Sequence, residues 1–190
     1  MISPMPAPLS PDFSRAQSLS RVMAIVLAIG LALAAFHLIE LAVLLLWQDA
    51  GNYPIAGETA ALILKLPLGP RSGAIIGTAL GGLAPVFILY HARSVFLHFA
   101  RGEVFAAAPI RHIQRAGIWL IAAPFGYAAQ QYILNYIAER FIVNLTTANA
   151  RPGHLDHQYV AFLFIGIGIC VIAYVMSEAQ RIAEEHASII

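Results

Sequence analysis

Residues 22–47 read VMAIVLAIGLALAAFHLIELAVLLLW, an apolar stretch that only His37 and Glu40 interrupt. A helix needs about 20 predominantly apolar residues to cross the hydrocarbon core of a bilayer. Three further stretches are comparably apolar, at 72–90, 116–138 and 159–176. Each is longer than the roughly 10 alternating residues of a membrane β-strand. We therefore predict an all-α fold, an integral membrane four-helix bundle with four spans.

The amino-acid composition agrees with this class of protein. Of the 190 residues, 59% are apolar and only 11% are charged, whereas roughly a quarter of a soluble domain is charged. Disorder along the whole chain is excluded, because disordered chains are rich in charge and poor in aliphatic residues. The formal net charge of +1 argues against direct nucleic acid binding. The single cysteine, Cys170, excludes an intrachain disulfide framework and a multi-cysteine zinc site.

The basic residues predict the orientation, because lysine and arginine are enriched in cytoplasmic loops. The N-terminal segment, the loop between the second and third spans and the C-terminal tail hold seven of the 11 basic residues. Both termini are therefore expected in the cytoplasm. A cleavable signal peptide is the competing interpretation of the first span, but the apolar run continues beyond the length that a signal peptide needs. We expect a disordered lead at 1–20 and one membrane domain at 21–190, with cytoplasmic helical extensions at 91–101, 109–115 and 177–190.

Several polar side chains fall within the predicted spans, where an acidic residue at mid-membrane costs about 2.5 to 3.5 kcal/mol. His37 and Glu40 are three residues apart and share one face of the first span. Counted at about 1.5 Å per residue from the inner end of each span, they reach the same depth as polar residues of the third span. We predict an intramembrane polar cluster of His37, Glu40, Gln130, Gln131 and Asn135. Three interpretations stay open: a clasp between two helices, a ligand or proton site, and snorkelling of Glu40 to the interface.

A stripe of small residues runs along the second span, formed by Gly73, Gly77 and Gly81. Small residues spaced four apart let two membrane helices approach closely. We expect this stripe to serve helix packing, either inside the monomer or at a homodimer seam.

Charged residues gather at the ends that we expect in the cytoplasm. His91 and His98 lie on one polar helical stripe, about 10 Å apart along its axis, which is too far to share a metal ion. The acidic tail is expected to dock on the basic second loop, and Arg181 to pair with Glu184 and Glu185 within the tail. This forms a cytoplasmic platform of Arg93, Arg101, Glu103, Arg111, Arg115, Glu178, Arg181, Glu184 and Glu185. We recognise no catalytic motif and expect neither a metal nor a cofactor.

Three segments carry a family resemblance: RGEVF at 101–105, PIRHIQRAGIWL at 109–120 and EAQRIAEE at 178–185. They resemble the four-helix bacterial membrane proteins catalogued as domain of unknown function 2975. In that family a helix runs into an Arg-Gly-Glu-Val-Phe-like turn and then into a basic helix start. The resemblance implies a location in the bacterial cytoplasmic (inner) membrane. Members are often encoded beside small helix-turn-helix regulators, which implies a cytosolic regulator of that kind as a partner.

The sequence favours a non-enzymatic regulatory or interaction protein that signals through its basic inner loop and acidic tail. The alternative is a small transporter or channel subunit that uses the His37 and Glu40 pair, and this would require a homo-oligomer to form a path. An integral membrane enzyme is the third interpretation. The lipid bilayer is the one partner that every interpretation shares.

Overall fold

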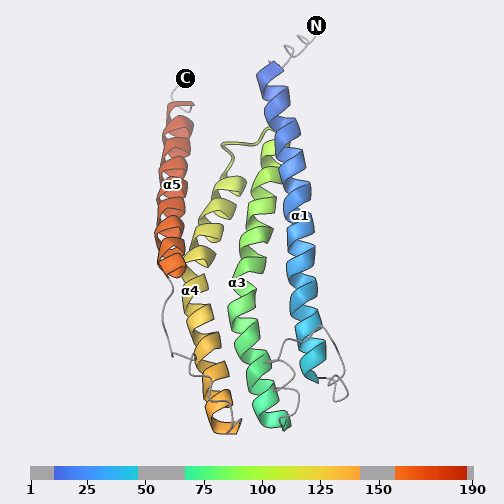
Figure 1. Cartoon of the computed structure of the whole chain (residues 1–190). Helices are drawn as coiled ribbons and strands as arrows, with labels where there is room; N and C mark the ends of the chain where they lie inside the picture. Colours follow the sequence, from blue (N-terminus) through green and yellow to red (C-terminus); the bar gives the residue numbers. More distant parts are fainter. Residues whose placement is uncertain (1–10, 47–66, 142–156, 188–190) are drawn as a thin grey trace, which may run out of the picture.

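The computed structural model describes residues 11–46, 67–141 and 157–187. Within these residues the chain forms four α-helices and no strand: α1 (Pro11–Leu46), α3 (Leu68–Ala100), α4 (Ala107–Phe141) and α5 (His157–Ala187). Figure 1 shows them running alternately up and down. The all-α prediction is therefore confirmed for the described part of the chain.

The helices extend beyond the predicted spans because the flanking residues are also compatible with a helix. Pro85 and Pro124 lie inside α3 and α4 without ending them, as proline often does in membrane helices. α1 begins at Pro11, and proline is favoured in the first turn of a helix. Residues 11–20 are thus helical, which corrects the predicted disordered lead, while residues 1–10 lie outside the described part.

A tight turn joins α3 to α4. Gly102 has a φ of 83°, a left-handed conformation that side chains other than glycine rarely adopt. The backbone amides of Arg101 and Glu103 donate hydrogen bonds to the carbonyl oxygen of His98, each at 3.0 Å. This satisfies carbonyl groups that the end of a helix leaves open, so the chain reverses within residues 101–106.

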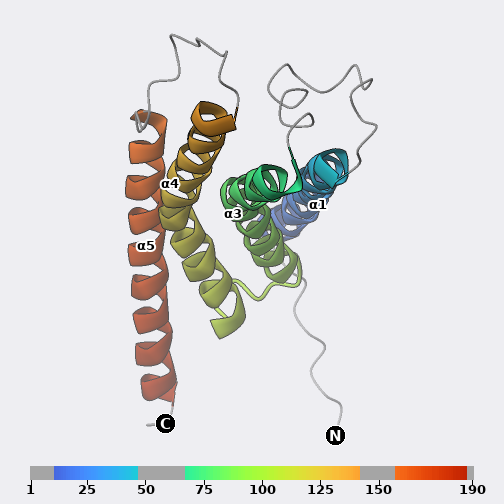
Figure 2. The same ribbon diagram turned by 90° about the horizontal axis from the view of Figure 1, so that it is seen from below.

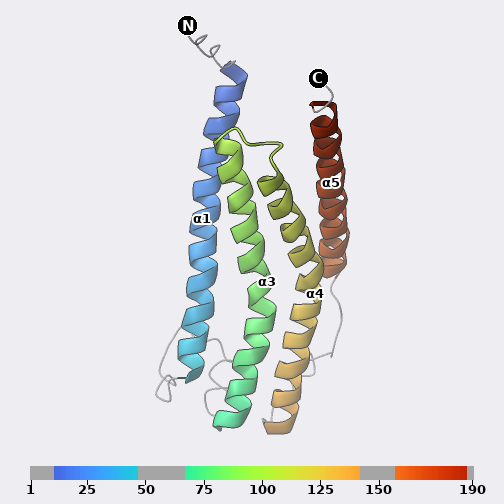
Figure 3. The same cartoon turned by 180° about the vertical axis from the view of Figure 1, so that it is seen from behind.

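The four described helices lie in a row that follows chain order. α1 packs on α3, α3 on α4 and α4 on α5, whereas α1 and α5 share no extensive contact. Figures 2 and 3 show α1 and α5 at the two edges of this row. The described helices therefore form an open layer and not the closed ring that the term bundle suggests. The N-terminal end of α1 and the C-terminal end of α5 lie at the same end of the row as the α3–α4 turn.

Three of the described helices are long and apolar enough to cross a membrane: Ser14–Glu40 within α1, Leu68–Ala100 and Tyr159–Ala187 within α5. α4 falls short of the same criteria, since polar side chains such as Gln130, Gln131 and Asn135 interrupt its apolar run. The structure thus supports three of the four predicted spans by length and composition.

Large apolar side chains cover the outside of the row. On α1, for example, Ile25, Leu33 and Phe36 are 61%, 64% and 65% exposed. The buried core is small, with Ala74 of α3 and Ile137 of α4 at its centre. Membrane helices associate through close packing and small residues, while their apolar side chains face lipid, and this arrangement is compatible with that environment.

Candidate functional site

A pair of histidines joins α3 to α4 beside the turn. The Nδ1 atoms of His91 and His112 lie 3.0 Å apart, and His91 is only 6% exposed. The ring of Tyr90 packs edge-on against both histidines, with centroids 5.1 and 6.4 Å away. A neutral imidazole has one N–H and one acceptor nitrogen, so one histidine donates through Nδ1 and the other accepts.

A second pair continues this cluster toward the turn. His98 Nδ1 lies 2.6 Å from Glu103 Oε2, and the ring centroids of His98 and His112 are 5.9 Å apart. The backbone of Glu103 is held by its hydrogen bond to the carbonyl of His98. The turn therefore positions the carboxylate that the His98 side chain contacts.

The electrostatic surroundings of His112 are positive. Burial lowers the pKa of His112 below its ordinary value, and the positive charges of His91, His98, Arg115 and Arg111 lower it further. Both effects disfavour the protonated imidazole. His112 is consequently held neutral near pH 7, the state in which it can complete the hydrogen bond to His91.

Arginines surround the same end of the two helices. Arg101, Arg111 and Arg115 are exposed and Arg93 is half-buried. Glu103 and Glu139 are the acidic residues between positions 68 and 141. We refer to His91, His98, Arg101, Glu103, Arg111, His112 and Arg115 together as the basic turn.

The basic turn contains most of the platform residues that the sequence predicts for the loop between the second and third spans. It also contains three histidines, which the sequence alone does not predict to lie together. The spacing of His91 and His98 along one helix excludes a metal ion shared by these two residues alone. That spacing does not take account of His112, which lies on α4 and contacts His91 in the folded chain. A signal for this contact is present in the sequence, since His91 and His112 flank one predicted turn between antiparallel helices. Their contact depends on the helix rotation, which the sequence pattern does not define.

The tail half of the platform pairs with itself. Arg181 Nη1 donates to Glu185 Oε1 at 2.8 Å, and its Nε donates to Glu178 Oε2 at 3.1 Å. Glu184 accepts a hydrogen bond from Gln180 at 2.8 Å. The predicted Arg181–Glu185 pair is confirmed, whereas Glu178 takes the place predicted for Glu184. In Figures 1 and 2 the end of α5 stands apart from the α3–α4 turn, so the structure does not bring the tail onto the basic loop.

The predicted intramembrane cluster is split between two sides of α3. Leu38 of α1 packs toward Gly82 of α3, and Gln130 of α4 packs against Gly81 on α3. His37 and Gln130 thus lie at similar depth, as the residue count predicts, but α3 separates their helices (Figure 1). His37 is exposed and Glu40 half-buried on α1. The clasp between the first and third spans is therefore not formed in this structure.

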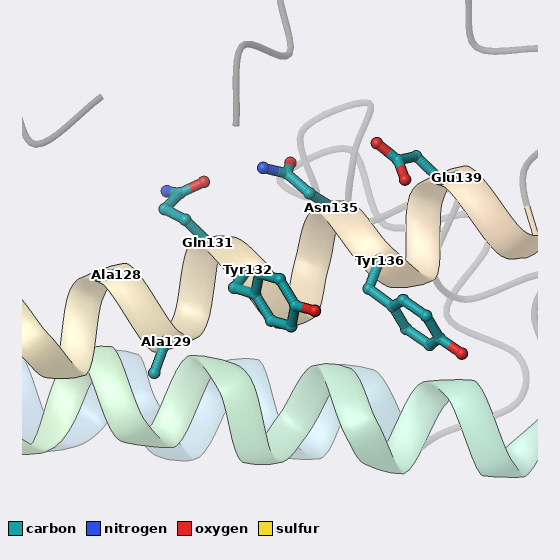
Figure 4. A pocket seen from close by; sticks show the side chains of 7 residues that line it. All are labelled: Ala128, Ala129, Gln131, Tyr132, Asn135, Tyr136 and Glu139. Carbon is teal, nitrogen blue, oxygen red and sulfur yellow. The ribbon is translucent and has the colours of Figure 1, made fainter. Parts of the chain in front are cut away.

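The remaining polar residues line a hollow beside α4, with a volume of about 660 Å³. Figure 4 shows the side chains of Gln131, Asn135 and Glu139 pointing away from α3 and α1, with Tyr132 and Tyr136 beside them. These polar side chains are four residues apart and form one stripe. The stripe explains why α4 is the least apolar of the described helices. The described residues that line this hollow all come from α4.

The glycine stripe on α3 packs inside the monomer. A Cβ atom at Gly77 would lie 3.1 Å from Ile133 Cγ2, and one at Gly73 would lie 3.3 Å from Ile137 Cδ1. A Cβ at Gly81 would overlap the side chain of Gln130. All three glycines therefore face α4, which favours packing within the chain over a homodimer seam.

Within the described residues, no group of three or more histidine, cysteine, aspartate or glutamate side chains is arranged to hold a metal ion. The chain matches no family model, no curated protein and no solved structure. The family resemblance at 101–105, 109–120 and 178–185 stays a prediction.

Proposed function

We propose that this chain is a non-enzymatic, multi-pass regulatory protein of the bacterial cytoplasmic membrane, and that the basic turn is its responsive element. The observation that carries the proposal is the 3.0 Å contact between His91 and His112. It links two helices at the end of the row where the N-terminal end of α1 and the C-terminal end of α5 also lie. A change at this contact therefore alters the end of the molecule that we propose to face the cytosol, where a partner can bind.

The chemistry of the pair makes it sensitive to protonation. With one proton between the two Nδ1 atoms, the pair forms a hydrogen bond; with both imidazoles protonated, two N–H donors and two positive charges face each other. Arg111 and Arg115 add to this repulsion. Full protonation thus favours separation of α3 and α4 at the turn, a two-state change of the kind that local charge produces in pH-responsive proteins.

A cytosolic partner is the second part of the proposal. In the tail of α5 the charged side chains of Arg181, Glu184 and Glu185 are exposed, and the family resemblance favours a small helix-turn-helix regulator as the molecule that binds there. The decisive experiment is affinity purification of the full chain in mild detergent, with identification of the proteins retained. Recruitment of a cytosolic regulator supports the proposal when deletion of residues 178–190 abolishes it and leaves membrane insertion intact. Recruitment that survives this deletion overturns the role of the tail.

The responsive role of the turn has its own test. His112→Gln removes one titrating partner at a site that can still accept or donate one hydrogen bond. If partner binding varies between pH 5.5 and 7.5 in the wild-type chain and becomes independent of pH in the variant, the turn is responsive. Binding that has the same pH dependence in both proteins refutes it.

We rank the transporter alternative second. A translocation site needs polar groups that converge on one path, and His37 on α1 is separated by α3 from Gln131 and Asn135 on α4. An enzymatic role ranks third, because no nucleophile paired with a base emerges among the described contacts.

A further inference from the structure

The basic turn concentrates positive charge at one end of the α3–α4 pair. Residues 91–115 contain four arginines and three histidines against one acidic residue, Glu103. That carboxylate already contacts His98 at 2.6 Å. The arginines of this region therefore have little negative charge near them within their own segment.

The positive charges of Arg111 and Arg115 lie close together near His112. They are four residues apart, so they lie on one side of the first turns of α4. Both are exposed, and both lower the pKa of His112 by their positive charge. Like charges held together raise the free energy of a site, and a bound anion relieves that repulsion. The arrangement thus favours an anionic ligand with several acceptor oxygens, such as a phosphate group.

The position of the charges favours a lipid as the source of the phosphate. Exposed apolar side chains continue along both helices below the basic turn, for example Ile118 at 52%. At the level of the charges two aromatic side chains are also exposed: Tyr90 is 46% exposed and Phe105, on the turn itself, is 73% exposed. Aromatic side chains are enriched where a membrane protein crosses the headgroup region. A phosphate held by the arginines would then lie at headgroup depth, with its acyl chains along the apolar surface.

We propose that Arg111 and Arg115, assisted by Arg101, bind the headgroup phosphate of an anionic phospholipid. The inference rests on the membrane location proposed above and identifies a lipid ligand for the basic turn. Basic pockets between membrane helices on the cytoplasmic side are known to bind anionic headgroups. The acidic tail is not the competing anion, because the end of α5 stands apart from the α3–α4 turn (Figures 1 and 2) and Arg181 of α5 already engages Glu178 and Glu185.

The test compares the full-length wild-type chain with an Arg111→Gln/Arg115→Gln variant and with Arg140→Gln. Arg140 is the matched control, since it is exposed at the opposite end of the same helix. Each protein is reconstituted in nanodiscs of phosphatidylcholine with increasing phosphatidylglycerol, and the lipids retained after extraction are quantified by native mass spectrometry. Near a membrane surface each basic residue contributes about a five-fold change in affinity for anionic lipid. We expect retention of phosphatidylglycerol to fall by more than ten-fold in the double variant and by no more than the about five-fold contribution of one basic residue in Arg140→Gln.

Three outcomes overturn the inference. The first is equal retention of phosphatidylglycerol by the wild type and the double variant, and the second is an equal loss in the double variant and the control. In the third, millimolar inorganic phosphate displaces the lipid from the wild type, which would assign the site to soluble phosphate. Flotation with pure phosphatidylcholine vesicles tests the membrane location separately. A wild-type chain that fails to float refutes the proposed location, whereas one that floats without retaining phosphatidylglycerol refutes the lipid site alone.

Discussion

Replacing Gly166 by alanine should separate α4 from α5. A Cβ atom at this position would lie 2.8 Å from the carbonyl oxygen of Gly117, 2.8 Å from Ile121 Cγ1 and 3.0 Å from the backbone nitrogen of Ile121. Ordinary van der Waals contact begins at 3.4 Å, and two of these three atoms belong to the α4 backbone, so neither can rotate away. The two helices would have to move apart along their contact.

The magnitude follows from what that movement disturbs. Overpacking a well-packed contact by one methyl group costs about 1 to 3 kcal/mol. The same displacement also strains the hydrogen bond from the Cys170 thiol to the Gln114 carbonyl, at 3.7 Å, and the stacking of Tyr127 on Tyr159, with centroids 4.3 Å apart. We therefore expect Gly166→Ala to lower the free energy of unfolding by about 1 to 3 kcal/mol.

Gly168 supplies a matched control on the same helix. A Cβ atom there meets nothing within 4 Å, so alanine adds no clash and removes some backbone freedom from the unfolded chain. Gly168→Ala should be neutral or stabilising by up to about 1 kcal/mol. Reversible unfolding in mixed detergent micelles, followed by circular dichroism, measures both values. Equal stability of the two variants would refute the close α4–α5 backbone contact.

The remaining predictions concern the α3–α4 and α1–α3 contacts. The pKa of His112 is lowered in the folded state, so the stability that its neutral form supplies is complete above the ordinary histidine pKa of about 6.5 and is lost as the pH falls below that value, through the lower pKa of the folded protein. Thermal unfolding between pH 7.5 and 5 should show a fall in melting temperature that His112→Gln reduces, and an unchanged melting temperature would contradict this. His37→Leu and Glu40→Gln should leave unfolding within about 0.5 kcal/mol of wild type, and a large loss in either would indicate the clasp that the structure lacks. Gly77→Leu should prevent the packing of Ile133 on α3 and yield misfolded protein by size-exclusion chromatography, whereas a folded particle that has lost only its oligomeric state would favour the homodimer seam.

The sequence identifies the helices well because their signal is local. Apolar runs with few charges predict the central part of every described helix, and RGEVF at 101–105 predicts the turn between α3 and α4. Helix ends are less well predicted, as residues 11–20 show, because polar residues such as Ser and Gln are compatible with both a helix and a loop. The weakest apolar run, that of α4, is also the one that falls short of the criteria for a span.

The neighbours of each helix are harder to predict, because depth and adjacency are different quantities. Counting residues places His37 and Gln130 at the same level, and the structure agrees, yet α3 lies between their helices. Which helices are neighbours depends on the direction in which the small residues of α3 face. Gly81 packs against Gln130 of α4, and the next residue, Gly82, packs against Leu38 of α1. Successive residues of a helix point about 100° apart, so two adjacent glycines of α3 contact two different helices.

The row of helices in chain order has a consequence for biosynthesis. Each described helix packs on the described helix before it, so none of these four helices has to enter between two that are already in contact. Synthesis proceeds at about 5 to 20 residues per second, which leaves seconds between the completion of successive helices, whereas helical proteins rich in local contacts fold in about microseconds to milliseconds. The packing of α3 on α1 can therefore be complete before α4 leaves the ribosome, and α5 can then pack on the exposed side of α4, at the edge of the layer that the first three described helices form.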